Sequence, residues 1–289
     1  MRRLLLALLL AVPPGISPAA ADATRPVSLP GAFEFLLPLA EGEDYRVMVW
    51  RPPGEPPADG WPAIVALDAD RTFLALADLV RSQSRNPDAT GVLPMVVVGI
   101  EAAKDAKDRR ARDFTPSGGG NPAEGGAEAF RGFLETVVKP TVGRVAPLDP
   151  KRQALFGNSY GGLFALWSAT AHPGDYALHA AASPSLWWNG AALMAADLAP
   201  LAAAKSAVLV TVAEYDQADD PLTERPGHGE KLAARRMVDN ARAFAARLKA
   251  AGVPTYTAEF AGETHGSTVP AAAARTARVA SHVFRSWSR

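Results

Sequence analysis

The sequence contains no cysteine among its 289 residues, and neither sign of charge is in excess. Without cysteine the chain cannot form a disulfide, a thiolate metal site, an iron–sulfur cluster or a cysteine nucleophile. Its 30 Lys and Arg residues balance 30 Asp and Glu residues, whereas a nucleic-acid-binding protein normally carries a basic surplus. Composition therefore argues against nucleic acid as a partner, and nucleophilic catalysis in this chain would fall to an activated hydroxyl.

Long apolar runs are also missing, because the early run 4–12 is too short to span a bilayer and no later stretch reaches about 18 residues. Arg2 and Arg3 precede this run and small residues follow it, which is the three-part pattern of a secretory signal peptide with cleavage after Ala21 or Ala23. We expect residues 1–23 to be a signal peptide and 24–289 to form a single domain. The mature chain would be periplasmic or secreted, without a membrane segment. A twin-arginine signal and an uncleaved anchor are the alternatives.

Strand-like and helix-like segments alternate along the remaining chain. Residues 33–39 and 45–50 predict two strands joined by the polar turn 41–44, an antiparallel hairpin. Further strands are expected at 63–67, 95–100, 154–156, 176–182, 207–213 and 255–260. Helices are expected at 73–81, from 130 to near Pro140, from the end of the strand 154–156 to about Thr170, at 230–251 and at 271–286. This alternation predicts an α/β fold with a mostly parallel sheet covered on both faces.

Two segments without a regular pattern, 101–128 and 216–229, would each follow a strand. In an open α/β sheet the loops at the carboxyl ends of the strands border the binding crevice. Both segments are therefore candidates to line a site.

Gly157, Ser159 and Gly161 fit the G-x-S-x-G pattern of a nucleophile elbow. The glycines let the chain turn sharply from a strand into a helix, which holds the serine hydroxyl above the sheet at the positive end of the helix. A glycine-rich turn with an incidental serine is the alternative. The apolar strand before the motif and the apolar helix after it favour the nucleophile.

A serine hydroxyl is a poor nucleophile unless a neighbouring base takes its proton. His265 lies in a short loop after the last expected strand, where the chain order Ser…Asp/Glu…His places the base, and His228 is the competing candidate. The orienting acid is expected after the strand 207–213. Spacing from a small residue there favours Asp216 over Glu214. Its carboxylate would accept the imidazole N–H and fix the tautomer.

The oxyanion hole is expected to use the backbone N–H of Tyr160, the residue after the nucleophile, and a second amide near Asp68 or Ala69. An aspartate-rich turn without a special role is the alternative for the second amide. No His, Asp and Glu cluster has recognisable metal-ligand spacing, so neither a metal nor another cofactor is expected.

Four motifs in this order carry a family resemblance: RDFTP at 112–116, GNSYGG at 157–162, SPSLWW at 183–188 and GETHGS at 262–267. Together they resemble the Putative esterase family of α/β-hydrolases. Within that family the sequence is most similar to the branch of periplasmic ferric-siderophore esterases, the enterobactin- and salmochelin-type trilactone hydrolases. The resemblance extends from about Phe33 to the C-terminus and implies the α/β-hydrolase fold and serine esterase chemistry.

The resemblance implies that Ser159 is the nucleophile and His265 the base. It also places Asp68 and Ala69 in the oxyanion region, where the family usually has Asp-Gly and this chain has Asp-Ala. Some siderophore esterases work with a serine–histidine pair and no conventional acid. Of the roles that the resemblance implies, that of Asp216 as the orienting acid therefore depends most on the structure.

The resemblance further implies that Arg112, Asp113 and Phe114 border the substrate pocket and that Trp187 and Trp188 form an aromatic wall. Tryptophans beside a cleft suit catecholate or other aromatic acyl groups, and Arg109, Arg110 and Arg112 suit an anionic ferric complex. The alternatives are that these arginines belong to a solvated loop and that the tryptophans belong to the core.

These observations predict an exported serine esterase that hydrolyses ester or lactone bonds through an acyl-enzyme. Its favoured substrate is a small-molecule ester, an anionic ferric siderophore of the trilactone type. One alternative keeps the fold but changes the substrate to another acyl ester, a feruloyl-type ester or a thioester. A non-catalytic siderophore-binding protein on a hydrolase fold is the other alternative.

Overall fold

The computed structural model describes residues 26–39, 44–104, 106–121, 123–222 and 228–287. The chain divides into a short N-terminal unit, Met1–Pro30, and a second unit, Gly31–Arg289. The predicted signal peptide and most of the predicted turn 41–44 lie outside the described residues. Within the described part of the chain, no helix is both long enough and apolar enough to cross a membrane.

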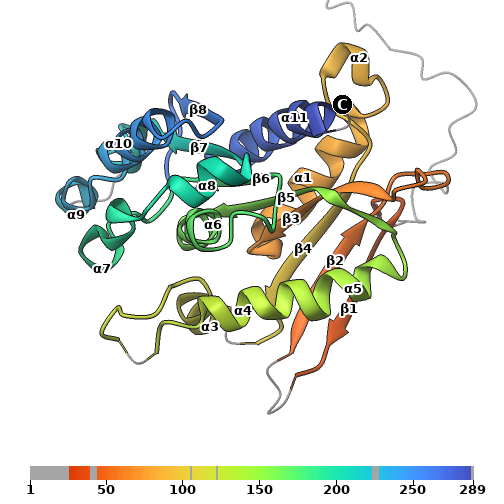
Figure 1. The fold of residues 1–289 in the computed structure, drawn as a ribbon, viewed down its shortest axis with the longest axis horizontal. Coiled ribbons are helices and arrows are strands. Elements are labelled where there is room, and N and C mark those ends of the chain that lie inside the picture. Colours follow the sequence, from red (N-terminus) through yellow and green to blue (C-terminus); the bar gives the residue numbers. More distant parts are fainter. Residues whose placement is uncertain (1–25, 40–43, 105, 122, 223–227, 288–289) are drawn as a thin grey trace, which may run out of the picture. The chain divides into compact units, whose positions relative to one another are not determined.

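A mixed sheet organises the second unit, and the described residues contribute eight strands to it in the order β1-β2-β4-β3-β5-β6-β7-β8 (Figure 1). The strands are β1 (Ala32–Leu37), β2 (Tyr45–Trp50), β3 (Trp61–Leu67), β4 (Val96–Ala102), β5 (Leu148–Asn158), β6 (Leu178–Ala182), β7 (Ala207–Ala213) and β8 (Thr255–Phe260). β2 pairs antiparallel with β1 and β4, whereas every pair from β4 to β8 is parallel. The predicted α/β class, the mostly parallel sheet and the N-terminal antiparallel pair are confirmed.

The direction of winding changes at β3. The chain passes from β3 to β4 on one side and then returns to β5 on the other side, so β3 and β5 are neighbours in the sheet. Ligands of open α/β sheets bind outside the carboxyl ends of the strands at such a switch point. The loops after β3 and β5 therefore meet where the topology favours a site.

Helices cover both faces of the sheet. They are α1 (Ala69–Gln83), α2 (Pro87–Thr90), α3 (Ala106–Asp113), α4 (Ala127–Phe133), α5 (Lys139–Gly143), α6 (Tyr160–Ala171), α7 (Trp188–Ala191), α8 (Ala199–Ala204), α9 (His228–Arg235), α10 (Met237–Ala250) and α11 (Val269–Trp287), with a π-helical turn η3 (Leu134–Val138) and the short 3₁₀ turns η4 (Ala192–Ala195) and η5 (Glu214–Asp216). α1 and α11 pack together against one face (Figure 1). α6 packs on β5 and β6, and α10 packs on β7.

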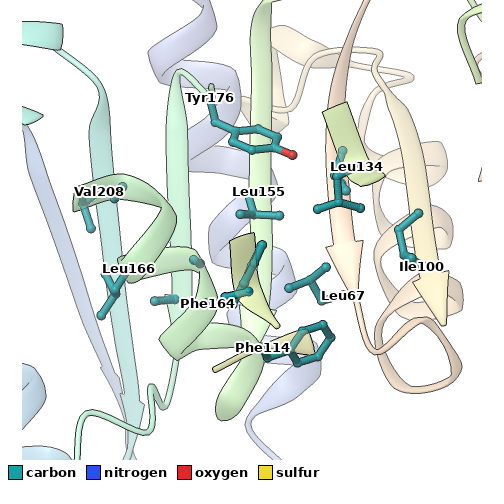
Figure 2. Close-up of a cluster of buried hydrophobic side chains, with 14 of the residues drawn as sticks. Leu67, Ile100, Phe114, Leu134, Leu155, Phe164, Leu166, Tyr176 and Val208 are labelled. Atoms are coloured by element: carbon teal, nitrogen blue, oxygen red, sulfur yellow. The ribbon is translucent and has the colours of Figure 1, made fainter. Parts of the chain in front are cut away.

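The main hydrophobic cluster joins the sheet to the helices on one of its faces, among them α6. Leu67 and Leu155 come from the strands and Phe164 comes from α6, and Figure 2 shows them close together. The Phe114 ring lies 5.9 Å from the Phe164 ring, centroid to centroid. Burying each such side chain stabilises the fold by roughly 1.5–3 kcal/mol. The cluster therefore fixes α6 on the sheet and, with it, the turn that leads into this helix.

The helix predicted over 230–251 is wrong as a single element, because α9 ends at Arg235 and α10 begins at Met237. Arg236 between them has a left-handed conformation with φ 49°. In a straight helix, Leu232 and Met237, five residues apart, would point about 140° away from each other. The break lets both side chains become buried, and Gly252 after α10 has the predicted left-handed conformation with φ +81°.

The helix predicted to end near Pro140 instead continues to Gly143. Proline lacks an N–H donor and its ring clashes with the preceding turn of a regular α-helix. Here the π-helical turn Leu134–Val138 widens the helix just before Pro140, which lies in the first turn of α5. In this turn the N–H of Lys139 donates to the carbonyl of Leu134, five residues back, and the wider turn accommodates Pro140 without ending the helix.

The turn between β5 and α6 depends on a very close backbone approach at Gly157. A Cβ atom added there would lie 2.2 Å from the carbonyl oxygen of Gly161, which is far inside van der Waals contact. The Cβ would be fixed to the backbone of residue 157, and the carbonyl it meets belongs to the backbone of Gly161. Neither can move without displacing the strand end or the helix start. An alanine at 157 would force the turn open.

We predict that Gly157→Ala lowers the free energy of unfolding by at least about 2 kcal/mol, because the backbone of α6 must shift. The matched control is Gly132→Ala in α4, where an added Cβ meets no atom within 4 Å and should stabilise the helix by about 0.5–1 kcal/mol. Urea unfolding of both variants measures the difference. An unchanged midpoint for Gly157→Ala would contradict the crowded turn.

Candidate active site

The loops after three neighbouring parallel strands, β5, β6 and β7, are joined by backbone hydrogen bonds. The N–H of Ser159, after β5, donates to the carbonyl of Ala182 at the end of β6 (2.9 Å). The N–H of Ser183, after β6, donates to the carbonyl of Thr211 in β7 (2.7 Å). The carboxyl edge of the sheet therefore holds these loops side by side; Ser159 follows β5, Asp216 follows β7, and His265 comes from the next loop, after β8.

Ser159 has the strained backbone of an elbow. Its φ of 61° and ψ of −115° lie outside the regions that non-glycine residues normally adopt, and such strain costs of order 1–3 kcal/mol. Its carbonyl accepts the N–H of Leu163 (2.9 Å), which starts α6. Strain of this kind persists only where surrounding packing over-determines it, and here it places the serine at the N-terminus of a buried helix.

The hydroxyl of Ser159 lies 3.3 Å from the hydroxyl of Ser185, oxygen to oxygen. The N–H of Ser185 also donates to the carbonyl of Ser159 (3.1 Å), and Ser185 is buried. Within the described part of the chain, no hydrogen bond joins Ser159 to His265. Ser185 is thus a direct neighbour of the predicted nucleophile. Ser185 belongs to the SPSLWW motif, but no role was predicted for it from the sequence.

The structure brings Asp216, and not Glu214, against His265. The Oδ1 atom of Asp216 is 2.6 Å from Nδ1 of His265. Its Oδ2 atom accepts the hydroxyl of Ser183 (2.6 Å) and the N–H of Ala213 (2.8 Å). Asp216 is fully buried, whereas the His265 side chain is 32% exposed. The imidazole is therefore held at one nitrogen and leaves its other edge toward accessible space.

Glu214 has a different contact, because its carboxylate accepts the N–H of Gly262 in the loop that carries His265 (2.7 Å). Ser183 is a partner of Asp216 that the sequence analysis did not identify. Its signal was present, since it opens the SPSLWW motif, but the motif does not show which side chain its hydroxyl reaches.

The other histidines have local explanations. His179 in β6 is completely buried, and this burial lowers its pKa to about 3, so it is neutral. His172 follows α6 and its Nε2 atom lies 2.8 Å from the Glu128 carboxylate. His282 packs on the ring of Tyr256. The side chain of His228, the competing base, lies outside the described part of the structure.

Two free amides at helix starts form the candidate oxyanion hole. Ala69 begins α1 after β3, and Tyr160 begins α6 after β5. No acceptor for either backbone N–H is found among the described residues, as expected for first-turn amides. Because β3 and β5 are neighbours, both amides lie at the same edge of the sheet, together with the positive ends of two helices.

Alanine at 69, where the family usually has glycine, meets no conformational penalty. The left-handed conformation is taken by Asp68, with φ 55° and ψ 56°, and Ala69 is already helical. Aspartate tolerates this conformation better than most residues. The departure from Asp-Gly therefore leaves the turn intact.

The arginines predicted in an irregular segment lie on helix α3, which is a correction to the expected loop. Arg110 donates from Nε to Oδ1 of Asp68 (2.6 Å) and from a terminal nitrogen to the carbonyl of Asn158 (2.9 Å). It thus links the turn after β3 to the strand end before Ser159. Arg110, Asp113 and Phe114 also line a narrow cavity next to Asp68.

Arg109 and Arg112 both contact Asp113, which is buried. Arg112 donates from Nε to Oδ1 of Asp113 (2.8 Å), and Arg109 Nε is 3.9 Å from its Oδ2. Arg109 is 9% exposed and its guanidinium lies 4.3 Å from the centroid of the Tyr45 ring. Burial and the neighbouring carboxylate of Asp113 raise the pKa of Tyr45 above its ordinary range. Much of the positive charge on α3 is therefore compensated by buried carboxylates.

A further acid, Glu101 at the end of β4, lies near the turn after β3 that carries Asp68 and Ala69. Burial raises its pKa to about 7, and the Asp68 carboxylate adds to the increase. The N–H of Asp70 in the first turn of α1 donates to it (3.3 Å) and opposes the shift. Glu101 is the group beside this turn that changes charge near neutral pH.

The aromatic residues predicted to line the pocket have different environments. Trp188 is buried, with its indole N–H donated to the Glu124 carboxylate (2.9 Å). Trp187 is half-buried, with its ring 6.1 Å from the ring of Tyr160. Phe114 is 5% exposed within the main hydrophobic cluster. Trp187 is therefore the member of this set that lies against the residue following the nucleophile.

Among the described residues, no group of three or more His, Asp or Glu side chains is arranged to hold a metal ion. The chemistry available at this edge of the sheet is that of a hydroxyl, an imidazole paired with a buried carboxylate, and free backbone amides.

Comparison with known proteins places this geometry in a family. The chain matches the Putative esterase family over residues 40–286. It is 34% identical to the ferri-bacillibactin esterase BesA of Bacillus subtilis over 258 residues, covering 84% of this chain and 86% of the relative. It is 29% identical to a siderophore triacetylfusarinine C esterase of Aspergillus fumigatus over 275 residues, covering 88% of this chain and 94% of the relative.

A solved structure supports the same family placement. The BES protein from Bacillus cereus superposes with a TM-score of 0.77 at 26% identity, covering 89% of this chain and 97% of that one. An elbow serine, a histidine bound to a buried aspartate and two free helix-start amides are the parts that ester hydrolysis requires. With the match across most of its length, the chain belongs to the Putative esterase family and is an ester hydrolase of the serine-hydrolase type.

Proposed function

We propose that this protein is an exported serine esterase that hydrolyses the ester bonds of a siderophore, with a ferric trilactone as the favoured substrate. The observation that carries the catalytic part of the proposal is the hydrogen bond between His265 and the buried Asp216, on the same edge of the sheet as the strained Ser159. A buried carboxylate on Nδ1 leaves Nε2 of the imidazole as the base.

In the proposed reaction, the Ser159 hydroxyl turns from Ser185 toward His265, which catalytic hydrogen bonds often do only when substrate is bound. His265 removes the hydroxyl proton while the serine oxygen attacks the ester carbonyl carbon. The N–H groups of Tyr160 and Ala69 donate to the oxyanion that forms. His265 then gives its proton to the leaving alcohol, and Ser159 is left acylated.

Deacylation repeats these steps with water. His265 takes a proton from the water molecule, whose oxygen attacks the acyl carbon, and returns a proton to Ser159 as the carboxylic acid leaves. Asp216 stays ionised throughout and stabilises the imidazolium formed in each half of the reaction.

The names of the relatives support a siderophore ester as the substrate. These relatives are a ferri-bacillibactin esterase, a siderophore triacetylfusarinine C esterase and a siderophore enterobactin esterase from Emericella nidulans. Trp187, half-buried beside Tyr160, would offer an aromatic surface to a catecholate. The basic, apolar and small residues at the N-terminus support export.

We expect Ser159→Ala to lower kcat by at least about 10³-fold while leaving the unfolding midpoint unchanged, because the variant removes the nucleophile and no packing. A fluorophosphonate probe should label the wild-type chain at Ser159 and fail to label the variant. Ser82→Ala, at an exposed serine of α1, is the control and should keep full activity. Retention of a tenth of the wild-type rate by Ser159→Ala would exclude Ser159 as the nucleophile.

For the acid, Asp216→Asn should lower kcat by about 10²–10⁴-fold, because the amide cannot hold the imidazolium as a carboxylate does. The control is Glu214→Gln, which keeps an oxygen able to accept the N–H of Gly262 and should leave kcat near the wild-type value. Steady-state rates on one ester decide between them. No loss in Asp216→Asn would show that a serine–histidine pair suffices, and equal losses in both variants would contradict a specific role of Asp216.

The substrate class is tested by comparing kcat/KM on a tris-catecholate trilactone with kcat/KM on p-nitrophenyl butyrate, a feruloyl ester and an acyl thioester. We expect the trilactone to be preferred by at least about tenfold, since binding energy from its remote groups lowers the barrier at the ester. Mass spectrometry identifies the products. A preference for one of the other esters would favour a general carboxylesterase, feruloyl esterase or thioesterase instead.

A further inference from the structure

The charge next to the candidate site is distributed differently from the way the sequence suggests. The three arginines expected to attract an anion lie on α3, where Arg110 is paired with Asp68 and Arg112 with Asp113. Arg109 is buried beside the same Asp113. The two buried carboxylates compensate two of these three positive charges, so this helix offers a ligand less net charge than the sequence suggests.

Another arginine, Arg235, lies beside the site and was not identified from the sequence. It is the last residue of α9, and its guanidinium carbon is 4.8 Å from the centroid of the Trp187 ring. Within the described part of the chain, Arg235 has no carboxylate partner. Its neighbour Arg236, in contrast, contacts Asp239 (3.4 Å).

Arg235 belongs to a row of stacked groups that leads to the nucleophile. The Trp187 ring lies 6.1 Å from the ring of Tyr160, and the Arg110 guanidinium lies 5.5 Å from that same ring. Tyr160 directly follows Ser159 in the chain. One end of the row, Arg110, is paired with Asp68, and the other end, Arg235, is exposed.

The electrostatics of Tyr160 agree with this placement. Burial raises the pKa of its phenol above the ordinary value, and the Glu124 carboxylate contributes to the increase. The guanidinium groups of Arg235 and Arg110 act in the opposite direction. Both cations are therefore close enough to be felt at the phenol. Glu124 is held by the indole N–H of Trp188, and not by Arg235.

The Trp187 ring is positioned by stacking. Its indole nitrogen has no hydrogen-bond partner among the described residues, whereas the nitrogen of Trp188 is bound to Glu124. A cation over a tryptophan face is attracted by the negative face of the ring. Arg235 is thus attracted to the ring while its guanidinium stays available for a second partner.

We propose that Arg235, stacked on Trp187, is a specificity-determining residue that selects anionic esters, and that it distinguishes the iron-loaded form of a catecholate substrate from the iron-free form. The proposal rests on the proposed siderophore esterase function. Three doubly charged catecholates around one Fe³⁺ make a trianionic complex, whereas the iron-free catechol ester is uncharged near neutral pH. Arg235 gains a charge partner only with the iron-loaded substrate, and Trp187 offers its surface to both.

The test measures KM and kcat of wild-type and Arg235→Gln protein on the ferric and the iron-free tris-catecholate trilactone. We expect Arg235→Gln to raise KM for the ferric ester about fivefold, the size of an exposed charge interaction, with kcat and the KM for the iron-free ester within twofold. Added salt should shrink the difference. Arg235→Lys, which keeps the charge, should recover most of the KM.

Arg242→Gln is the matched control. It removes one positive charge from the adjacent helix α10, where Arg242 is bound to Glu259 through two hydrogen bonds (2.7 and 2.6 Å). Its KM values should equal those of the wild type. A fivefold rise for the ferric ester in Arg242→Gln as well, or equal rises for both esters in Arg235→Gln, would overturn the role of Arg235.

A second measurement does not depend on trilactone turnover. Ferric 2,3-dihydroxybenzoate is used as an inhibitor of p-nitrophenyl butyrate hydrolysis, and its inhibition constant should rise about fivefold in Arg235→Gln. Equal inhibition constants for wild type and variant overturn the proposal. If the wild type cleaves p-nitrophenyl butyrate but neither trilactone, the siderophore function fails, and the inhibition constants still decide whether Arg235 selects anions.

Discussion

The buried carboxylate of Asp216 is the contact on which the geometry of the site depends. It accepts three hydrogen bonds, from a side chain after β6, from its own strand end and from the imidazole of His265 after β8. An ionised group without solvent is costly unless it is hydrogen-bonded, and each bond to a charge contributes roughly 1.5–3 kcal/mol. The same bonds that compensate this burial hold three loops together and orient the base. Stability and catalysis therefore share one group here.

The nucleophile side of the site depends on sheet topology. Because the winding reverses at β3, the starts of α1 and α6 become neighbours, although they are about ninety residues apart in the chain. Each helix begins with an amide that has no acceptor, and the residue before each has a positive φ: Asp68 in one turn and Ser159 in the other. Backbone strain at these two positions aims two donors at the same edge. Arg110 fastens the turns to each other through Asp68 and the Asn158 carbonyl.

The parts of this arrangement that follow from local chemistry could be predicted from the sequence. The strands at 45–50, 207–213 and 255–260 were predicted to the residue, because apolar or alternating runs of strand length bounded by turn residues have few alternatives. The G-x-S-x-G pattern predicted the turn, and the structure gives the physical reason for its first glycine, because the close approach at Gly157 tolerates no side chain. Asp216 was preferred to Glu214 by spacing alone, and the structure places Asp216 against His265.

What could not be predicted depends on contacts between distant segments. Helix α3, with the sequence AKDRRARD, has little apolar pattern and is held by pairs such as Arg110 with Asp68. The partners of Ser183 and Ser185 lie 33 and 26 residues away in the chain. Trp187 and Trp188 are the same residue type in adjacent positions, yet one is buried on Glu124 and the other is half-buried beside Tyr160. Composition and order do not distinguish such cases.

Zero net charge conceals how the charges are used. Counting side chains gives 30 of each sign, but the effective charge at a site depends on which of them are paired in low dielectric. On α3 the buried carboxylates of Asp68 and Asp113 compensate two of the three guanidinium charges, and these ion pairs tie the helix to its surroundings. Arg235 is held over an aromatic ring, which attracts the cation without neutralising it. An aromatic partner therefore positions a positive charge and leaves it available to a ligand, whereas a carboxylate partner positions the charge and neutralises it.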